Sequence, residues 1–334
     1  MRGSRSIWQQ VATRGNSLRG HGSVGTASHS IVAMSSSAVS PVLNATLQAS
    51  LVELIRITST VLPQDVVRAV TAAKGDEVAG TNAAYALNVI DCNIGLAKEK
   101  SQPLCQDTGS ILFYVHAPVG YDQLTFADTA IAAVQEATVK GYLRQNSVDS
   151  LTGKNSGNNT GPGTPDFHFH QWREAHVEVK LMLKGGGCEN VGATYTLPHP
   201  KFGGRDLKGV ENAVLDCVLQ AQGQGCGPGI LGVGIGGDRV SGMACAKTQL
   251  LRLLDDVNPD ATLAGLEQRV VEKSNQSGIG PMGFGGKTTL LGCKAGALNR
   301  VPASFFVAIS YMCWAFRRQG VTLDDNGSIS KWLY

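Results

Sequence analysis

The sequence predicts an α/β protein, with a mixed α+β arrangement as the alternative. Segments with strand character alternate along the chain with segments of helical periodicity. Hydrophobic residues make up 43% of the 334 residues and charged residues only 16%, so the chain can bury a large core. The 41 glycines indicate many loops. We therefore expect one large domain in which helices pack on mostly parallel sheets and loops carry the functional groups.

The first half of the chain begins with a predicted helix at Thr58–Gly75. Pro63 lies near its start, valines fall on one face, and Gly75 is a typical stop residue. The next predicted elements are a helix, a strand and an alanine-rich helix, at Asn82–Lys100, Ser110–His116 and Phe126–Leu143. The last of these helices delivers Arg144 at its C-terminal end.

Residues 145–170 interrupt this periodicity, because glycine, asparagine, proline, serine and threonine dominate there. A loop of this length inside an enzyme is often functional. His176–Leu183 then alternates apolar and polar residues, which predicts a strand. The remaining predictions are helices at Asp206–Gln222, Val240–Asp255 and Leu263–Ser274, and strands at Ile230–Ile235, Thr288–Leu298 and Ala303–Met312.

The N-terminal segment differs from the rest in charge. Residues 1–52 contain four arginines and no acidic residue, and the remaining chain has 25 basic against 26 acidic residues. This near-neutral body gives no electrostatic reason to expect nucleic acid. Residues 1–40 have the composition of a transit peptide, so we expect a mitochondrial matrix protein, with a plastid or cytoplasmic location as the alternative. A disordered tail or a misplaced start codon would explain the same composition; in each case residues 41–334 form the functional domain.

Three of the eight cysteines lie between glycine, proline or polar residues at the ends of predicted elements. They are Cys105, Cys226 and Cys313, and none of them has a neighbour at zinc-knuckle spacing. Taken singly, each is typical of a buried thiol. Three thiols arriving from distant loops suit an iron–sulfur cluster that leaves one iron free to act as a Lewis acid. We expect the other five cysteines to bind no metal.

Two glycine-rich segments allow several interpretations. Gly232–Gly237 matches a dinucleotide-binding pattern, but the predicted strand overlaps its glycines. Gly280–Thr289 resembles a phosphate loop whose first glycine is one residue too early. The alternatives for the second segment are a tight turn or an amide-lined wall of an active site, which we favour. His168, His170 and His176 could suggest zinc, but we favour surface or structural histidines, because His-x-His is common in strands and loops and no cysteine lies close in sequence.

The motifs together resemble the α-subunit, or N-terminal domain, of class I iron–sulfur-dependent fumarate hydratases, a family that includes L(+)-tartrate dehydratase. They follow the family's order and extend from about residue 100 to residue 318. The matching segments are Pro-Leu-Cys-Gln-Asp-Thr-Gly at 103–109, Leu-Arg-x-x-Ser at 143–147, Lys-Gly-Gly-Gly-x-Glu-Asn at 184–190, Cys-x-Pro-Gly-x-Leu-Gly-x-Gly-Ile-Gly-Gly at 226–237, Gly-Ile-Gly-Pro-Met-Gly-x-Gly-Gly-Lys-Thr-Thr at 278–289, Pro-Ala-Ser at 302–304 and Cys-Trp-Ala-x-Arg-Arg at 313–318.

The resemblance implies that a [4Fe–4S] cluster is bound by the three framed cysteines. It further implies reversible hydration of fumarate to L-malate, or dehydration of a related hydroxydicarboxylate such as tartrate. Asp107 is then the catalytic carboxylate, transferring or orienting a proton. The implied substrate contacts are Gln106 as a hydrogen-bond partner, Arg144 through its guanidinium and Gly187 through its backbone.

The chain departs from the family pattern at three points. Val301 stands where a histidine usually precedes Pro-Ala-Ser, Cys188 stands where a serine is expected, and the chain stops soon after Cys313. The third departure predicts a separate β-subunit in a hetero- or homo-oligomer. We expect neither nucleic acid nor a membrane among the partners. The competing hypotheses are a non-catalytic, cluster-holding sensor or assembly subunit, and a nucleotide-binding enzyme.

Overall fold

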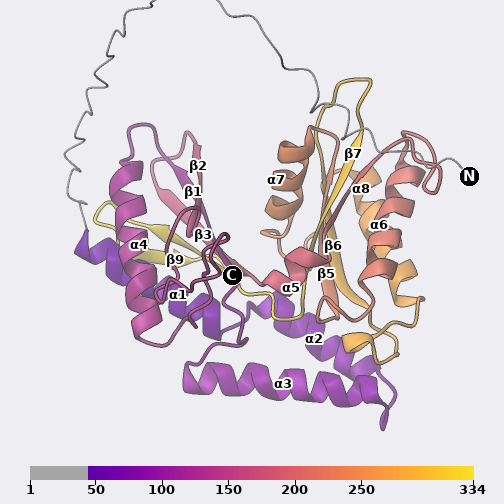
Figure 1. Cartoon of the computed structure of the whole chain (residues 1–334), viewed down its shortest axis with the longest axis horizontal. Helices are drawn as coiled ribbons and strands as arrows, with labels where there is room; N and C mark the ends of the chain where they lie inside the picture. Colours follow the sequence, from indigo (N-terminus) through magenta and orange to yellow (C-terminus); the bar gives the residue numbers. More distant parts are fainter. Residues whose placement is uncertain (1–43) are drawn as a thin grey trace, which may run out of the picture. The chain divides into compact units, whose positions relative to one another are not determined.

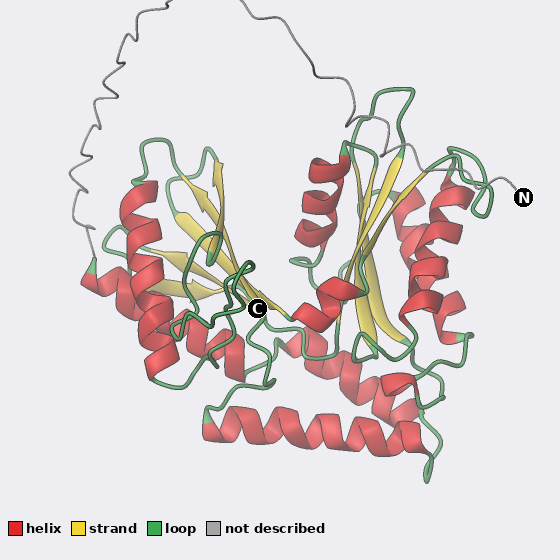
Figure 2. Ribbon diagram, viewed as in Figure 1, coloured by secondary structure: helices red, strands yellow, loops and turns green. Residues whose placement is uncertain are grey.

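The computed structural model describes residues 44–334, so the predicted transit peptide lies outside the described residues and stays a prediction. The α/β class is confirmed: two mixed sheets are accompanied by helices (Figures 1 and 2). The expectation of mostly parallel sheets is wrong. Among the strands of residues 44–334, the β1–β2 and β5–β6 pairs are parallel and the other pairs are antiparallel. The alternation of helices with strands concealed this, because several connections join different sheets.

The first sheet has the strand order β2-β1-β3-β8-β9. Alternate residues of β1 point to opposite faces. Phe113 and its neighbours face a core under helices α1 and α4, and Tyr114 faces a second core that also contains Cys313. Burial on both faces explains the continuous apolar run of β1. The bounds are β1 Ser110–Ala117, β2 Asp166–Gln171, β3 Val177–Lys184, β8 Arg318–Leu323, β9 Ile329–Trp332, α1 Ala45–Thr60 and α4 Gln123–Val139.

The second sheet has the order β4-β7-β5-β6, with α7 on one face and α6 and α8 on the other (Figure 1). A Cβ on Gly232 or Gly234 of β5 would lie 2.0 Å from a carbonyl oxygen of α7. These glycines therefore serve close helix–strand packing and not a dinucleotide. The bounds are β4 Ala193–Thr196, β5 Gly229–Ile235, β6 Leu290–Ala297, β7 Phe306–Met312, α6 Leu207–Ala221, α7 Arg239–Gln249 and α8 Ala261–Asn275.

The remaining elements are helices α2, Gln64–Asp76, and α3, Asn82–Lys100, the short helix α5, Gly186–Asn190, and the 3-10 turn η2, Pro281–Gly283. The helix predicted at Thr58–Gly75 is two helices, because α1 ends at Thr60 and Pro63 caps the start of α2. A proline lacks the N–H that a helix interior needs, so the break falls at this point.

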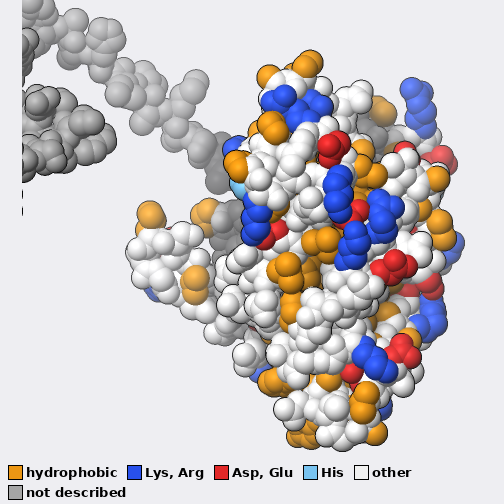
Figure 3. Space-filling view, turned by 90° about the vertical axis from the view of Figure 1, so that its right-hand side faces the viewer, with side chains coloured by type: hydrophobic (Ala, Val, Ile, Leu, Met, Phe, Trp, Pro, Cys, Tyr) orange, Lys and Arg blue, Asp and Glu red, His pale blue; other side chains and the backbone are white. Residues whose placement is uncertain are grey.

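Among the helices of residues 44–334, none is both long and apolar enough to cross a bilayer. Figure 3 shows the face on the right of Figure 1, where Lys and Arg side chains lie among Asp and Glu side chains. Between α6 and α8, Glu211 is paired with Lys208, Arg269 and Lys273. The mixed signs on this face agree with the near-neutral charge of the body.

Candidate functional site

The Cys226 loop is shaped by the ring of Tyr311. A Cβ on Gly225 or Gly229 would lie 2.3 Å from atoms of that ring, so only glycine lets the loop pass. Cys226 itself has a φ of +52°, a backbone conformation that is uncommon for a residue with a side chain. Cys226 is exposed, whereas Cys313, directly after β7, is buried. The glycines around Cys226 thus place its thiol beside the end of β7.

The structure brings the three predicted cysteine ligands into one neighbourhood. The glycines on either side of Cys226 pack against Tyr311, two residues before Cys313. The Cys105 loop is joined to the segment after Cys313 by Arg317, whose guanidinium donates to the Asp107 carbonyl oxygen at 2.6 Å. Burial raises the pKa of Cys226, and charge on Cys188, Cys105 and Asp107 raises it further. Cys188 of α5 belongs to the same buried apolar cluster as Cys313. The site therefore holds four thiols, of which the sequence predicted three; the glycine-rich turn around Cys188 was the signal for the fourth.

The other four cysteines lie on regular elements: Cys92 on α3, Cys217 on α6, Cys245 on α7 and Cys293 on β6. Burial raises the pKa of Cys217 to about 12 and also raises that of Cys293. Cys217 and Cys293 are small buried side chains of the core, whereas Cys245 is partly buried and Cys92 is exposed.

The donor set fits an iron–sulfur cluster better than a single ion. Within residues 44–334, no group of three or more His, Cys, Asp or Glu side chains converges as ligands of one ion. In a cluster each cysteine binds a different iron, so its ligands lie further apart. The backbone N–H of Asp107 also points at the Cys105 sulfur, 3.4 Å away, and such a donor stabilises a bound thiolate.

The Asp107 carboxylate joins three segments of the chain. One oxygen accepts hydrogen bonds from the Gly109 N–H at 2.8 Å and the Asn146 amide at 2.6 Å. The other oxygen accepts from the Gly186 N–H at 2.7 Å. Three donors fix the orientation of the carboxylate, a geometry that favours the orienting role over the proton-transfer role. Asp107 and Asn146 also line a cavity of about 310 Å³ together with Gly186.

Arg144 is held beside this loop by its backbone. Its N–H donates to the Thr108 hydroxyl at 2.9 Å, and its carbonyl oxygen accepts from Thr108 at 2.7 Å and from Asn159 at 2.8 Å. The guanidinium is exposed and makes no hydrogen bond or ion pair to residues 44–334 in the structure. A fixed backbone with an uncommitted guanidinium suits the binding of a carboxylate that arrives from outside.

Gln106 and Gly187 are both open to solvent. Gln106 follows Cys105 directly and is exposed. A Cβ on Gly187 would meet no atom within 4 Å, so the protein itself does not require glycine there. Gly187 lies at the start of α5, next to Gly186, whose N–H binds Asp107. Only a molecule bound in this open space could exclude a side chain at this position.

Two buried cations at the site were missed by the sequence analysis. Arg317 is 1% exposed and donates to the Asp107 carbonyl oxygen at 2.6 Å. Lys184 is fully buried and donates to the Tyr311 carbonyl oxygen at 2.9 Å. Burial lowers the pKa of Lys184, and the nearby Glu189 opposes that shift. Both lie in motifs quoted above, but their neighbours in sequence did not reveal that they are buried.

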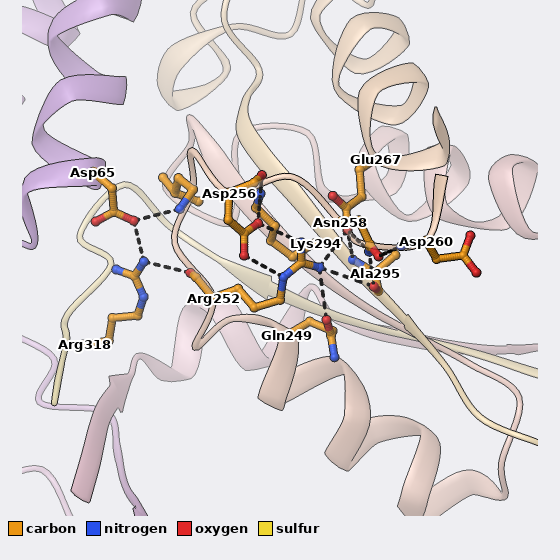
Figure 4. A network of polar contacts seen from close by, with 11 residues as sticks. Asp65, Gln249, Arg252, Asp256, Asn258, Asp260, Glu267, Lys294, Ala295 and Arg318 are labelled. Atoms are coloured by element: carbon orange, nitrogen blue, oxygen red, sulfur yellow. Dashed lines mark hydrogen bonds and ion pairs between the residues drawn. The ribbon is translucent and has the colours of Figure 1, made fainter. Parts of the chain in front are cut away.

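Arg318, the next residue of the same motif, anchors the segment that follows Cys313. Its guanidinium donates to Asp65 of α2 at 2.5 Å and to the Arg252 carbonyl oxygen at 2.9 Å (Figure 4). Arg252 in turn pairs with Asp256 and Glu267 through its own guanidinium. This network ties α2, the loop after α7 and α8 to the segment that carries Cys313.

The second glycine-rich segment does not form an open wall. The N–H groups of Lys287 and Thr288 donate to one oxygen of Glu77, at 2.7 and 3.0 Å. A Cβ on Gly280 would lie 1.7 Å from the Gly285 carbonyl oxygen, so the loop closes on itself. The favoured interpretation of this segment as an anion-binding wall is therefore wrong for these two donors, which an internal carboxylate already occupies.

Val301 lies away from the Asp107 cavity. It is 64% exposed and lines a separate hollow together with Asp238, Ser241 and Arg300. Within residues 44–334 this hollow shares no lining residue with the Asp107 cavity. The histidine-to-valine departure thus leaves the surroundings of Asp107 in this chain unchanged.

Comparison with known proteins decides the family. The model of the fumarate hydratase (fumerase) family matches residues 48–322. The chain belongs to the fumarate hydratase family. This match covers the three framed cysteines, Asp107 and both glycine-rich segments, so the resemblance drawn from the motifs is confirmed.

Individual members of the family show how the chain relates to longer and shorter proteins. A Geobacillus stearothermophilus protein provisionally named as a class I fumarate hydratase is 54% identical over 290 residues, which are 85% of this chain and 56% of the relative. The chain thus spans little more than half of that relative's length. The L(+)-tartrate dehydratase subunit alpha of Escherichia coli K12 is 32% identical over 265 residues, 78% of this chain and 85% of the relative. A Methanocaldococcus jannaschii protein provisionally given the same subunit name is 33% identical over 272 residues, 80% of this chain and 94% of the relative.

Proposed function

We propose that this fumarate hydratase family member is the cluster-bearing α-subunit of a hydro-lyase. Its substrate would be fumarate or L-malate, or a related hydroxydicarboxylate such as tartrate. The observation that carries the proposal is that the loops of Cys105 and Cys226 both pack against the segment of Cys313, through Arg317 and Tyr311, inside the family match. The names of the relatives support a hydro-lyase and leave the choice between fumarate and tartrate open.

The three cysteines would hold a [4Fe–4S] cluster through their thiolates. When bound, the cluster would supply an iron without a protein ligand, a Lewis acid for the hydroxyl that leaves or enters the substrate. The buried Arg317 donates to the Asp107 carbonyl oxygen, so its positive charge lies beside both the Cys105 loop and the segment of Cys313. A positive charge at this depth stabilises negative charge on the thiolates and on a dianionic substrate.

The residues around Asp107 would bind and orient the substrate. Arg144 presents a free guanidinium, which binds a carboxylate through two parallel hydrogen bonds. Gln106 offers an exposed amide beside Cys105, and Gly187 leaves space for the substrate against the start of α5. Asp107 would hold the Cys105 loop and the Gly186 turn in register through its hydrogen bonds, so that these groups face one substrate.

A partner β-subunit would complete the pocket. Two relatives that align along most of their own length carry the name subunit alpha, and the Geobacillus relative is much longer than the aligned region. Both facts support a second polypeptide that adds groups for the second carboxylate and for the carbon-bound proton. A base is needed because the C–H bond of malate is only weakly acidic.

The test is co-expression of the full chain with a candidate β-chain under anaerobic conditions. Loss of fumarate absorbance and formation of oxaloacetate from tartrate would be followed for each chain alone and for the pair. The proposal predicts turnover of at least one substrate that requires both chains. Iron-loaded pairs without turnover of fumarate, malate or tartrate would overturn the hydro-lyase assignment and favour a non-catalytic, cluster-holding role.

A further inference from the structure

Asn159 lies in the long loop between α4 and β2, and it is only 2% exposed. Its φ of +62° is in the left-handed region, which asparagine adopts more readily than most residues with a side chain. Its side-chain amide donates to the Arg144 carbonyl oxygen at 2.8 Å and to the Thr138 hydroxyl at 3.0 Å. Its side-chain oxygen accepts from the Asn146 N–H at 2.7 Å. The donors and the acceptor of this buried side chain are thus all committed to the protein itself.

These bonds hold the backbone on both sides of Gln145. The Arg144 carbonyl oxygen accepts from Asn159 and also from the Thr108 hydroxyl, at 2.7 Å, and the Arg144 N–H donates to that same hydroxyl at 2.9 Å. The Gln145 carbonyl oxygen accepts from the Asn155 side-chain amide at 3.3 Å. Because three successive peptide groups are held in this way, the direction in which the Arg144 side chain leaves the backbone is fixed.

The same arrangement reaches Asp107 through one further residue. Asn146, whose N–H donates to Asn159, donates its side-chain amide to the Asp107 carboxylate at 2.6 Å. Asp107 has two backbone N–H donors besides Asn146, so it stays anchored if that one contact is weakened. Arg144 has no second support of this kind on its carbonyl side other than Thr108. Loss of the Asn159 side chain should therefore disturb Arg144 more than Asp107.

We propose that Asn159 is a positioning residue for substrate binding: it touches no substrate and directs the Arg144 guanidinium toward the substrate carboxylate. The inference rests on the proposed function, in which Arg144 is a substrate contact. A guanidinium on a backbone that is already ordered loses less conformational entropy when it binds a carboxylate. This assigns a purpose to the long loop after Arg144, which is to hold the segment that carries the substrate arginine.

The first test measures the contact itself in the full chain, purified anaerobically. Asn159→Gly removes the side chain, and glycine adopts the φ of +62° without strain. The Asn146 N–H then loses its acceptor, so its exchange with deuterium should become at least about tenfold faster. Hydrogen exchange with single-residue fragmentation measures this without cluster, partner or turnover. Unchanged exchange at Asn146 would overturn the proposal.

The second test measures the consequence for substrate binding in the co-expressed pair of chains. Asn159→Gly should raise KM about tenfold and change kcat less than about threefold, because ground-state binding through Arg144 is weakened. In an Arg144→Ala background, the same change should alter kcat/KM less than about twofold, since the group that Asn159 directs is absent. Equal fold-changes in both backgrounds would overturn the proposal and leave Asn159 as a residue that only stabilises the loop.

Asn258 provides the matched control, because it is another buried asparagine with the same set of bonds. It donates to the Glu267 carboxylate at 2.7 Å and to the Ala295 carbonyl oxygen at 2.9 Å, and it accepts from the Asp260 N–H at 3.1 Å (Figure 4). Asn258→Gly should lower the midpoint of urea unfolding at least as much as Asn159→Gly and leave KM at the parent value.

The two proposals fail in different ways. Turnover by the parent pair, with an unchanged KM in Asn159→Gly, would contradict the inference alone. An equal rise of KM in Asn258→Gly would also contradict it, because general loosening of the fold would then explain both variants. No turnover by the parent pair would contradict the proposed function, and the positioning role would fall with it.

Discussion

The two glycine-rich segments, 184–190 and 278–289, are similar in sequence and opposite in structure. In the first, Gly187 faces open space and the Gly186 N–H holds Asp107. In the second, Gly280 lets two strands of the loop pass at contact distance, and Glu77 binds the free N–H groups. The first segment keeps space beside the cysteines, whereas the second removes space between α2 and β6.

The comparison shows that glycine has two distinct uses in this chain. One is to leave room for a molecule that is not part of the protein, and the other is to let backbone meet backbone. The sequence alone does not separate them, because the deciding residues, Asp107 and Glu77, are 79 and about 200 residues distant from the glycines they serve. The difference is accessible to experiment, because the two uses predict opposite effects of an added side chain.

The largest effect is expected when the closed segment receives a side chain. Gly280→Ala would place a Cβ 1.7 Å from a carbonyl oxygen at a φ of +70°, so we expect a loss of at least about 3 kcal/mol or no soluble protein. The matched change in the open segment is Gly187→Ala, which should leave the free energy of unfolding equal or slightly higher, because alanine favours a helix. Denaturant unfolding of both variants measures this. Equal destabilisation of the two variants would contradict the distinction between a closed and an open segment.

The next effect concerns binding and not stability. Arg144→Ala, beside the open segment, should lower kcat/KM about 100-fold, because a charged hydrogen-bonding pair with the substrate is lost. Its control is Lys287→Ala in the closed segment, whose side chain binds only the Asp76 carbonyl oxygen. That variant should change kcat/KM less than about threefold. Steady-state kinetics with the partner chain and the cluster absorbance separate binding from cluster loss; similar losses in both variants would contradict the distinction.

A smaller effect is expected when the internal anion of the closed segment is removed. Glu77→Gln weakens two charge-assisted hydrogen bonds and should cost about 1–2 kcal/mol of stability. Turnover per folded molecule should stay at the parent value, because this segment has no proposed contact with the substrate. Thermal unfolding and active-site-normalised rates check the two statements. A lower turnover per folded molecule in Glu77→Gln, together with weaker substrate binding, would show that the second segment is part of the active site.

The smallest effect is expected at Glu211, outside both segments, and it provides a reference for the effects within them. Burial alone would raise the pKa of Glu211, but hydrogen bonds from Lys273, Arg269 and Lys208 outweigh it and lower that pKa from 4.5 to about 2. A lowered carboxyl pKa means that this stabilisation is complete above about pH 4.5 and is lost as the pH falls towards 2. Because all three cations are substantially exposed, Glu211→Gln should cost only about 1 kcal/mol at pH 7.

Urea unfolding of the parent and Glu211→Gln at pH 7 and near pH 3 tests the sign. The difference between the two proteins should shrink on acidification. A difference that grew towards low pH would show that folding raises the pKa of Glu211, against the charge pairing described above.

Particular residues show how much of the fold could be predicted from the sequence. The convergence of the three cysteines followed from motifs, because each lies at an element end where loops can meet. Strand β2 was missed because Phe167 and Phe169 alternate inside a segment dominated by glycine and asparagine. Strand β8 was missed because its residues Arg318 and Gln319 are buried, against the usual preference of such side chains for the surface.

The residues of the candidate site also fall into those that the sequence predicts and those that it does not. Residues adjacent to a cysteine, such as Gln106 and Asp107, could be named from the sequence. Lys184, Arg317 and Asn146 could not, because their roles depend on contacts across the fold with Tyr311 and with the Asp107 loop. Local pattern thus identifies groups that share a loop, and only packing reveals the charges that surround them.

The most direct test of the central claim is the iron and acid-labile sulfide content of the full chain after anaerobic reconstitution. The account predicts about four irons and four sulfides per chain, and at least a fivefold loss in Cys105→Ser, Cys226→Ser or Cys313→Ser. Cys92→Ser, an exposed thiol on α3, should retain the parent content. A parent chain that takes up no iron, or equal losses in Cys92→Ser and the three site variants, would contradict the account.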